Sequence, residues 1–311
     1  MRVALRLILP VLLIGGFLWV FGTAGIGARL AAAEWGWITL ALLCLLAQTV
    51  LMALRWRLIA RCLGIRFGTG WAIQEYLISQ FVNLTLPGGV LGDAGRAVRS
   101  RAEALRPAAL AVVVERAAGQ VGMLGIASIG LIWVLAAPGA LRLPPIVPPT
   151  LATGLIAAVL VGMYVLARFR SGRVLRLLQV CLPDRRVAGI QVILSLGAAF
   201  LNVLAFAACA RATGTALSPQ AVLLVVPAIL TAMLIPFTIG GWGWREGAAA
   251  ALFPIAGASP SAGVAAGIVF GGAMMLSVLP ALPLLLISMR RQPHVSGAGP
   301  QPVDTRTEAV E

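Results

Sequence analysis

The segment NLTLPGGVLGDAGR, residues 83–96, breaks an apolar run with proline, glycine and charge. A second segment of the same kind, PFTIGGWGWREG, spans residues 236–247. In both, an apolar helix-like run ends at a proline, continues through glycines, and reaches an acidic residue and an arginine. Broken helices in matching positions of two halves are typical of membrane transport sites. The pair predicts two re-entrant hairpins, with ordinary interfacial loops as the alternative for each segment alone.

Composition places these segments in a membrane. The chain has 311 residues, of which 60% are hydrophobic and 11% are charged. Soluble domains carry roughly 25% charged residues, so this chain lacks the polar residues that a water-facing surface needs. The composition therefore predicts a protein with several membrane spans and excludes a soluble globular enzyme.

The charges set the expected orientation. The net charge is +14, from 24 basic and 10 acidic residues, and every basic residue is an arginine. The arginines lie in short stretches between apolar runs, which is the pattern of the positive-inside rule, so no nucleic-acid partner is expected. Four cysteines without CxxC spacing and one histidine, His294 in the polar tail, give no reason to expect a metal site or another cofactor.

Six apolar runs are predicted to cross the membrane: Leu7–Phe21, Trp35–Leu54, Ala108–Ala136, Thr150–Ala167, Val187–Ala210 and Ala262–Met289. For the first run, a cleaved signal peptide is the alternative. The run Trp71–Leu86 is short, contains several polar residues and is followed by four arginines. We therefore expect the chain to enter the membrane here from the cytoplasm and to return to the same side. We predict an all-α polytopic membrane protein with about six full spans plus two re-entrant broken-helix hairpins in inverted repeats. We expect residues 1–290 to form the transmembrane domain and residues 291–311 to form a disordered cytoplasmic tail, with both termini cytoplasmic.

Charged residues near the hairpins are the candidate site. An arginine or aspartate at mid-bilayer costs about 2.5–3.5 kcal/mol on insertion scales, so such residues usually face partners or water. Neighbours such as Arg245 and Glu246 point in different directions along a helix, so we expect a network across the hairpins rather than direct neutralisation. Arg96, Arg116 and Arg245 could then hold a phosphate. The alternative is that these charges form structural ion pairs.

Two sets of residues follow from this hypothesis. The candidate substrate-binding side chains are Asn83, Asp93, Arg96, Glu115, Arg116, Arg245 and Glu246. The candidate hairpin residues are Pro87, Gly88, Gly89, Gly92, Pro236, Gly240, Gly241 and Gly243. No catalytic residue is assigned.

The motifs resemble those of the flippase-like transmembrane domain of bacterial lysylphosphatidylglycerol synthetases, which also occurs in stand-alone proteins, including hopanoid-locus members. The family pattern Asn-x-x-x-Pro-Gly-Gly followed by Gly-Gly-Asp-x-x-Arg is matched by residues 83–96, with Leu91 in place of the first glycine of Gly-Gly-Asp. A Glu-Arg pair in the next span and Pro…Gly-x-Gly-x-Arg-Glu in the second half also match, at Glu115-Arg116 and residues 236–246. The resemblance covers about residues 1–290.

The resemblance implies lipid handling, with translocation of phospholipids between leaflets as the leading activity. The soluble aminoacyl-transfer domain is outside the resemblance, so synthesis of lysyl-lipid is not expected. We expect a non-enzymatic protein of the bacterial inner membrane whose partner is a lipid with an anionic headgroup, a phospholipid or an isoprenoid lipid. The alternatives are a membrane-embedded headgroup transferase with Asp93 or Glu246 as the base, and a non-catalytic partner of a lipid or glycan synthase.

Overall fold

The structure is a computed structural model that describes residues 15–16, 19, 23–86, 89–101, 104–137, 141, 179–234, 238–288 and 296–297. Its helices are α2 (Thr23–Ala31), α3 (Trp35–Cys62), α4 (Thr69–Thr85), α5 (Leu91–Arg99), α6 (Leu105–Ala136), α9 (Arg185–Ala212), α10 (Pro219–Ala232), α11 (Trp244–Leu252), the 3₁₀ turn η1 (Phe253–Ala256), α12 (Pro260–Val278) and α13 (Ala281–Ser288). Strands β1 (Ile65–Arg66) and β2 (Ser296–Gly297) pair antiparallel.

Several predictions fall on residues that are not described. They concern the spans Leu7–Phe21 (apart from Gly15, Gly16 and Trp19) and Thr150–Ala167, the hairpin residues Pro87, Gly88 and Pro236, and most of the tail 291–311.

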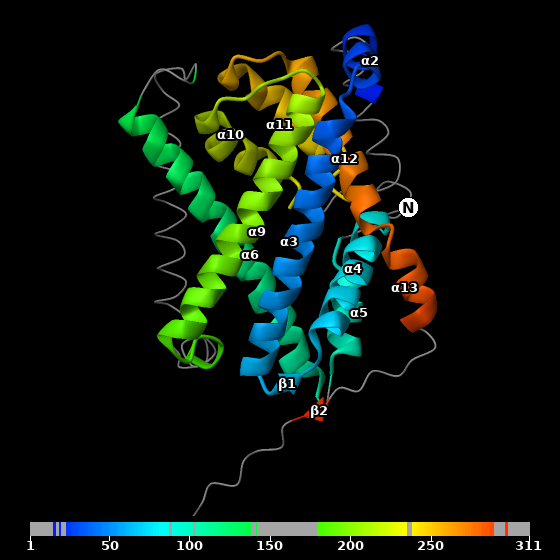
Figure 1. The fold of residues 1–311 in the computed structure, drawn as a ribbon, viewed down its shortest axis with the longest axis vertical. Coiled ribbons are helices and arrows are strands. Elements are labelled where there is room, and N and C mark those ends of the chain that lie inside the picture. The colour runs from blue at the N-terminus through cyan, green and yellow to red at the C-terminus, as the bar shows by residue number, and fades with distance from the viewer. Residues whose placement is uncertain are drawn as a thin grey trace, which may run out of the picture.

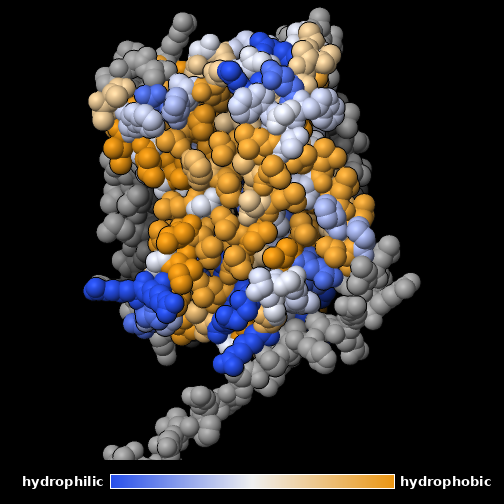
Figure 2. All heavy atoms as spheres, viewed as in Figure 1, coloured by the Kyte–Doolittle hydropathy of each residue, from blue (hydrophilic) through white to orange (hydrophobic). Residues whose placement is uncertain are grey.

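Four helical stretches in the described part of the chain are long and apolar enough to cross a membrane: α3, α6, α9, and the stretch Pro260–Leu285, which comprises α12 and most of α13. Figure 2 shows an apolar belt around the middle of the visible face, with hydrophilic residues gathered at both ends. Since a membrane's hydrocarbon core is about 30 Å thick and a helix rises 1.5 Å per residue, each of these helices has sufficient length. The chain is therefore an all-α polytopic membrane protein, as predicted.

The first broken element is a hairpin made of α4 and α5, which pack against each other. α4 begins just after β1, at the lower end of the bundle in Figure 1, and α5 runs back toward that end. A Cβ at Gly92 would collide with the backbone oxygen of Ser79, so only glycine allows the two arms to approach this closely. The Gly92 N–H donates to Oδ1 of Asn83 at 2.8 Å, which ties the arms together at the break.

The second broken element is formed by α10 and α11, and it opens at the opposite, upper end of the bundle (Figure 1). Its turn contains Gly240, Gly241 and Gly243, with φ of 57°, 74° and 89°. Side chains strongly disfavour this backbone region, which explains why the sequence is glycine-rich here. The two hairpins therefore enter the bundle from opposite sides, as an inverted repeat requires.

Two helices differ from their predicted bounds. The last predicted span is interrupted at Leu279 and Pro280, so α12 and α13 are separate helices. Proline has no backbone N–H to donate to a helix, and this favours the interruption. α3 continues to Cys62 rather than ending at Leu54, and this extension carries Arg55 into the interior, where it is 1% exposed.

Candidate functional site

A cavity of about 510 Å³ lies where the two breaks meet. Its wall includes Gly89 and Val90 from the first break, and Gly240 and Gly241 from the second. Helices α3, α4, α5, α6, α9, α10 and α12 contribute the remaining wall residues. The volume falls within the range of about 300–1,000 Å³ that is usual for small-molecule sites. The inverted hairpins thus line a cavity between them, at the place where the sequence predicts a binding site.

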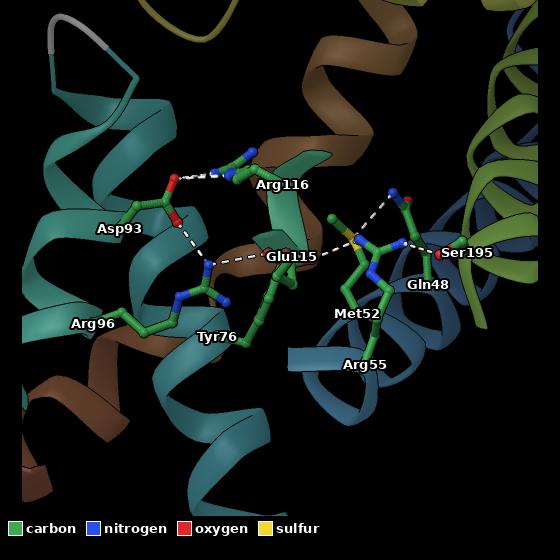
Figure 3. Close-up of polar contacts among 9 residues, drawn as sticks. All are labelled: Gln48, Met52, Arg55, Tyr76, Asp93, Arg96, Glu115, Arg116 and Ser195. Atoms are coloured by element: carbon green, nitrogen blue, oxygen red, sulfur yellow. Dashed lines mark hydrogen bonds and ion pairs between the residues drawn. The ribbon is translucent and has the colours of Figure 1, made fainter. Parts of the chain in front are cut away.

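Glu115 on α6 is the centre of a buried ion-pair network (Figure 3). Its Oε1 accepts from Nη2 of Arg55 at 2.6 Å and from the hydroxyl of Tyr76 at 3.0 Å. Its Oε2 accepts from Nη2 of Arg96 at 3.2 Å. Glu115 is fully buried, so these contacts replace the water that an ionised carboxylate would otherwise require. The network joins α3, α4, α5 and α6 at one point.

Asp93 connects this buried network to the cavity. Its Oδ1 accepts from Arg96 at 3.0 Å and from the hydroxyl of Ser79 at 3.1 Å. Its Oδ2 accepts from Nε of Arg116 at 2.8 Å. Asp93 and Arg116 both line the cavity, and the side chain of Arg116 is 44% exposed. Arg116 is therefore the cation of the network that a ligand in the cavity can reach.

Arg96 is held from every side. Its guanidinium carbon lies 4.6 Å from the ring centroid of Trp56 and 4.3 Å from that of Tyr76, and the residue has no exposed surface. Contact with an aromatic face stabilises a guanidinium through cation–π attraction. With Asp93 and Glu115 also bound, Arg96 is enclosed within the protein rather than presented to the cavity.

The second hairpin has a separate ion pair, and here the sequence-based geometry was wrong. Arg245 and Glu246 contact each other directly, with Nη2 2.5 Å from Oε1, although they are sequence neighbours. The other carboxylate oxygen, Oε2, accepts from the N–H of Gly243 at 2.6 Å. The Arg245 guanidinium lies over the rings of Trp242 and Phe270, at 4.8 and 5.7 Å. Long side chains can fold back toward each other even where the Cα–Cβ directions diverge, so this pair neutralises itself.

The predicted site residues are therefore divided between two places. Asp93, Arg96, Glu115 and Arg116 lie together in one network, and Asn83 lies beside it on the cavity wall. Arg245 and Glu246 are buried and do not line the cavity, and no ion pair among the described residues joins the two hairpins. The expected network across the hairpins is thus confined to the first hairpin and its neighbours.

Sequence reasoning missed three parts of the site. Arg55 directly follows the predicted span Trp35–Leu54, yet it is a buried partner of Glu115. Tyr76 was not singled out, because one hydroxyl in an apolar run carries no pattern. The amides on the cavity wall were missed for the same reason, since Gln48, Gln120 and Asn202 stand alone in separate helices. For Tyr76 and the amides, the only available sign of a role in the site was the position of a polar residue inside an apolar run.

The sequence was also compared with known proteins. A family model described as the lysylphosphatidylglycerol synthase TM region matches residues 7–281. No curated protein and no solved structure gave a match.

Proposed function

The chain belongs to the lysylphosphatidylglycerol synthase transmembrane-region family, and from this premise we propose that it translocates a lipid with an anionic headgroup between membrane leaflets. Membership makes it a membrane lipid-related protein. The observation that carries the proposal is the half-exposed Arg116 on the wall of a cavity formed by two opposed re-entrant hairpins.

The charge of the network supports an anionic headgroup. Three guanidinium groups, those of Arg55, Arg96 and Arg116, face two carboxylates, those of Asp93 and Glu115. One positive charge is left in excess, and Arg116 carries it to the cavity. A bound phosphodiester would neutralise this excess and would accept charge-assisted hydrogen bonds from the guanidinium.

The rest of the cavity wall suits an amphiphile. Four methionines, Met52, Met123, Met233 and Met274, line it together with leucines and Phe270. Methionine is unbranched and adaptable, so it can pack against glyceride and acyl groups of varied shape. Among the described residues, the cavity wall combines Arg116 and its partner Asp93 with uncharged polar groups and a flexible apolar surface, which is the combination that the headgroup end of a lipid needs.

The test is leaflet exchange in proteoliposomes. Fluorescent phosphatidylglycerol and phosphatidylcholine would be incorporated, and the label in the outer leaflet would be reduced with dithionite to follow exchange. Wild type would run beside Arg116→Gln and a control, Arg185→Gln, which removes an exposed arginine outside the cavity. Each protein would first be shown to be folded by size exclusion and circular dichroism.

We expect wild type and Arg185→Gln to exchange the anionic lipid faster than the zwitterionic one. In Arg116→Gln, the exchange rate of the anionic lipid should fall at least about tenfold, because one charge-assisted hydrogen bond is worth about 1.5–3 kcal/mol. Absence of exchange by folded wild type, with any lipid and with an imposed ion gradient, would overturn the proposal. The scaffold and transferase alternatives would then be tested by co-purification and by lipid analysis.

A further inference from the structure

Uncharged polar groups without partners converge on the cavity. Gln120 on α6 and Asn202 on α9 line it, and neither side chain makes a hydrogen bond within the part of the chain that the structure describes. Gln80 on α4 accepts from Thr49 at 3.0 Å through Oε1, while its amide nitrogen has no described partner. These free groups come from three different helices and line the same cavity.

Two further polar atoms at the hairpin breaks are buried without a partner among the described residues. They are Nδ2 of Asn83, beside the first break, and Oγ1 of Thr238, in the second. Buried polar atoms in native proteins are nearly always hydrogen-bonded, and these two, unlike the other unpaired buried atoms of the described residues, lie on the cavity wall, where a ligand or water can complete them. Both hairpins contribute, so the ligand that completes them would contact both halves of the protein.

The chemistry of these groups indicates hydroxyls. An amide side chain offers both donors and an acceptor, and a threonine hydroxyl does the same, so each can pair with a hydroxyl in either direction. A phosphate only accepts hydrogen bonds, and a quaternary ammonium neither donates nor accepts. In the proposed function Arg116 binds the phosphate, so the amides and Thr238 can hydrogen-bond to another part of the headgroup.

A cationic headgroup has no corresponding partner. Asp93 is the carboxylate among the described residues of the cavity wall. It already accepts from Ser79, Arg96 and Arg116, and its side chain is 11% exposed. An ammonium group placed in the cavity would therefore meet Arg116 without an unpaired carboxylate to offset it.

We infer that the headgroup taken by this cavity is a phosphodiester bearing several free hydroxyls, such as a glycerol, an inositol or a sugar. The inference rests on the proposed function for the lipid and adds the class of its headgroup. Arg116 binds the phosphate, and the free amides of Gln80, Gln120 and Asn202 bind the hydroxyls.

The test measures binding and exchange separately. Purified protein in detergent would be titrated with phosphatidylglycerol, phosphatidylinositol, phosphatidylmethanol and phosphatidylcholine, with bound lipid counted by native mass spectrometry. Phosphatidylmethanol is the critical probe, because it has the same phosphodiester charge as phosphatidylglycerol and lacks the hydroxyls. The same lipids, carrying a fluorescent acyl chain, would be followed for leaflet exchange in proteoliposomes.

Variants of the cavity wall test whether its amides cause the preference for a headgroup with hydroxyls. Gln120→Leu and Asn202→Leu each remove an amide of similar size, and each should weaken phosphatidylglycerol binding about threefold to tenfold, as expected for one lost hydrogen bond. Phosphatidylmethanol binding should stay unchanged in both. The matched control is Gln191→Leu, which removes a buried amide from α9 outside the cavity and should leave every lipid unchanged.

The outcomes separate the two proposals. Wild type should bind phosphatidylglycerol and phosphatidylinositol at least about tenfold more tightly than phosphatidylmethanol, as expected when several hydrogen bonds are added. Equal binding of phosphatidylglycerol and phosphatidylmethanol, or tighter binding of phosphatidylcholine, overturns the inference even if lipids exchange. Selective binding without exchange of any lipid supports the headgroup class and overturns translocation.

Discussion

Removing the charge of Glu115 should destabilise the protein more than any other single change in the first hairpin's network. Glu115→Gln keeps the shape of the side chain and one acceptor oxygen, but it leaves Arg55 and Arg96 facing a neutral group. These arginines are 1% and 0% exposed, so water cannot replace the lost charge. Breaking a buried pair in this way typically costs about 3–5 kcal/mol. Because Arg96 keeps Asp93, we expect a loss near the lower limit, about 3 kcal/mol.

The free energy of unfolding would be measured by sodium dodecyl sulfate titration in mixed micelles, followed by far-UV circular dichroism. Ser195→Ala is the control, because it removes one hydrogen bond of 3.3 Å to Arg55 and leaves every ion pair in place. It should cost about 0.5–1.5 kcal/mol.

A double variant tests the charge argument directly. Adding Arg55→Met to Glu115→Gln leaves Arg96 and Arg116 against Asp93, so the excess returns to one positive charge, as in wild type. The double variant should therefore recover at least half of the lost free energy. A Glu115→Gln loss no larger than that of Ser195→Ala, or a double variant less stable than both single variants, would refute the view that charge balance holds the network together.

Three further predictions concern the hairpins and their orientation. Gly92→Ala should cost about 1–3 kcal/mol of unfolding free energy, because the new Cβ would collide with the backbone of α4. Gly95→Ala is the control and should be tolerated, because its Cβ would meet only the flexible end of Arg99. Equal losses in the two variants would contradict this prediction. Glu246→Gln should destabilise the second hairpin by about 3–5 kcal/mol, because it leaves Arg245 buried without its partner charge. The double variant Arg245→Met with Glu246→Gln should be more stable than Glu246→Gln alone. It should also retain lipid exchange, since neither residue lines the cavity. In a protein without its native cysteines, an impermeant maleimide added to intact cells should label Ala216→Cys and not Arg185→Cys; the reverse pattern would invert the orientation predicted from the arginines.

The hairpins could be predicted because their signals are local. A proline followed directly by glycines favours a helix break, and the polar residues between Trp71 and Leu86 disfavour a full crossing. The three-residue spacing of Asp93 and Arg96 likewise fixes a shared helical face, and the two side chains do contact each other.

The partners of Glu115 could not be predicted, because they depend on how far a helix continues. An arginine at the end of an apolar run reads as a headgroup anchor when the helix stops there, and as a buried residue when the helix goes on. α3 continues to Cys62, so Arg55 lies inside the bundle and reaches Glu115 from 60 positions away. The pair Arg245–Glu246 depends on side-chain torsions, which helical spacing does not determine.

The two hairpins have similar sequences, but among their described residues the ion pair of the first lines the cavity and that of the second does not. At the second, Glu246 holds both Arg245 and the N–H of Gly243 in full burial, so a headgroup would have to break two buried contacts to enter. At the first, the side chain of Arg116 is 44% exposed, so a ligand can reach it without breaking a buried contact.

We propose that a phosphate binds the exposed side of Arg116 while Asp93 keeps its bonds to Arg116, Arg96 and Ser79. The buried part of the network then stays closed when the ligand binds. In the proposed function, ligand binding falls to the first hairpin, and the second hairpin provides a fixed surface beside the headgroup.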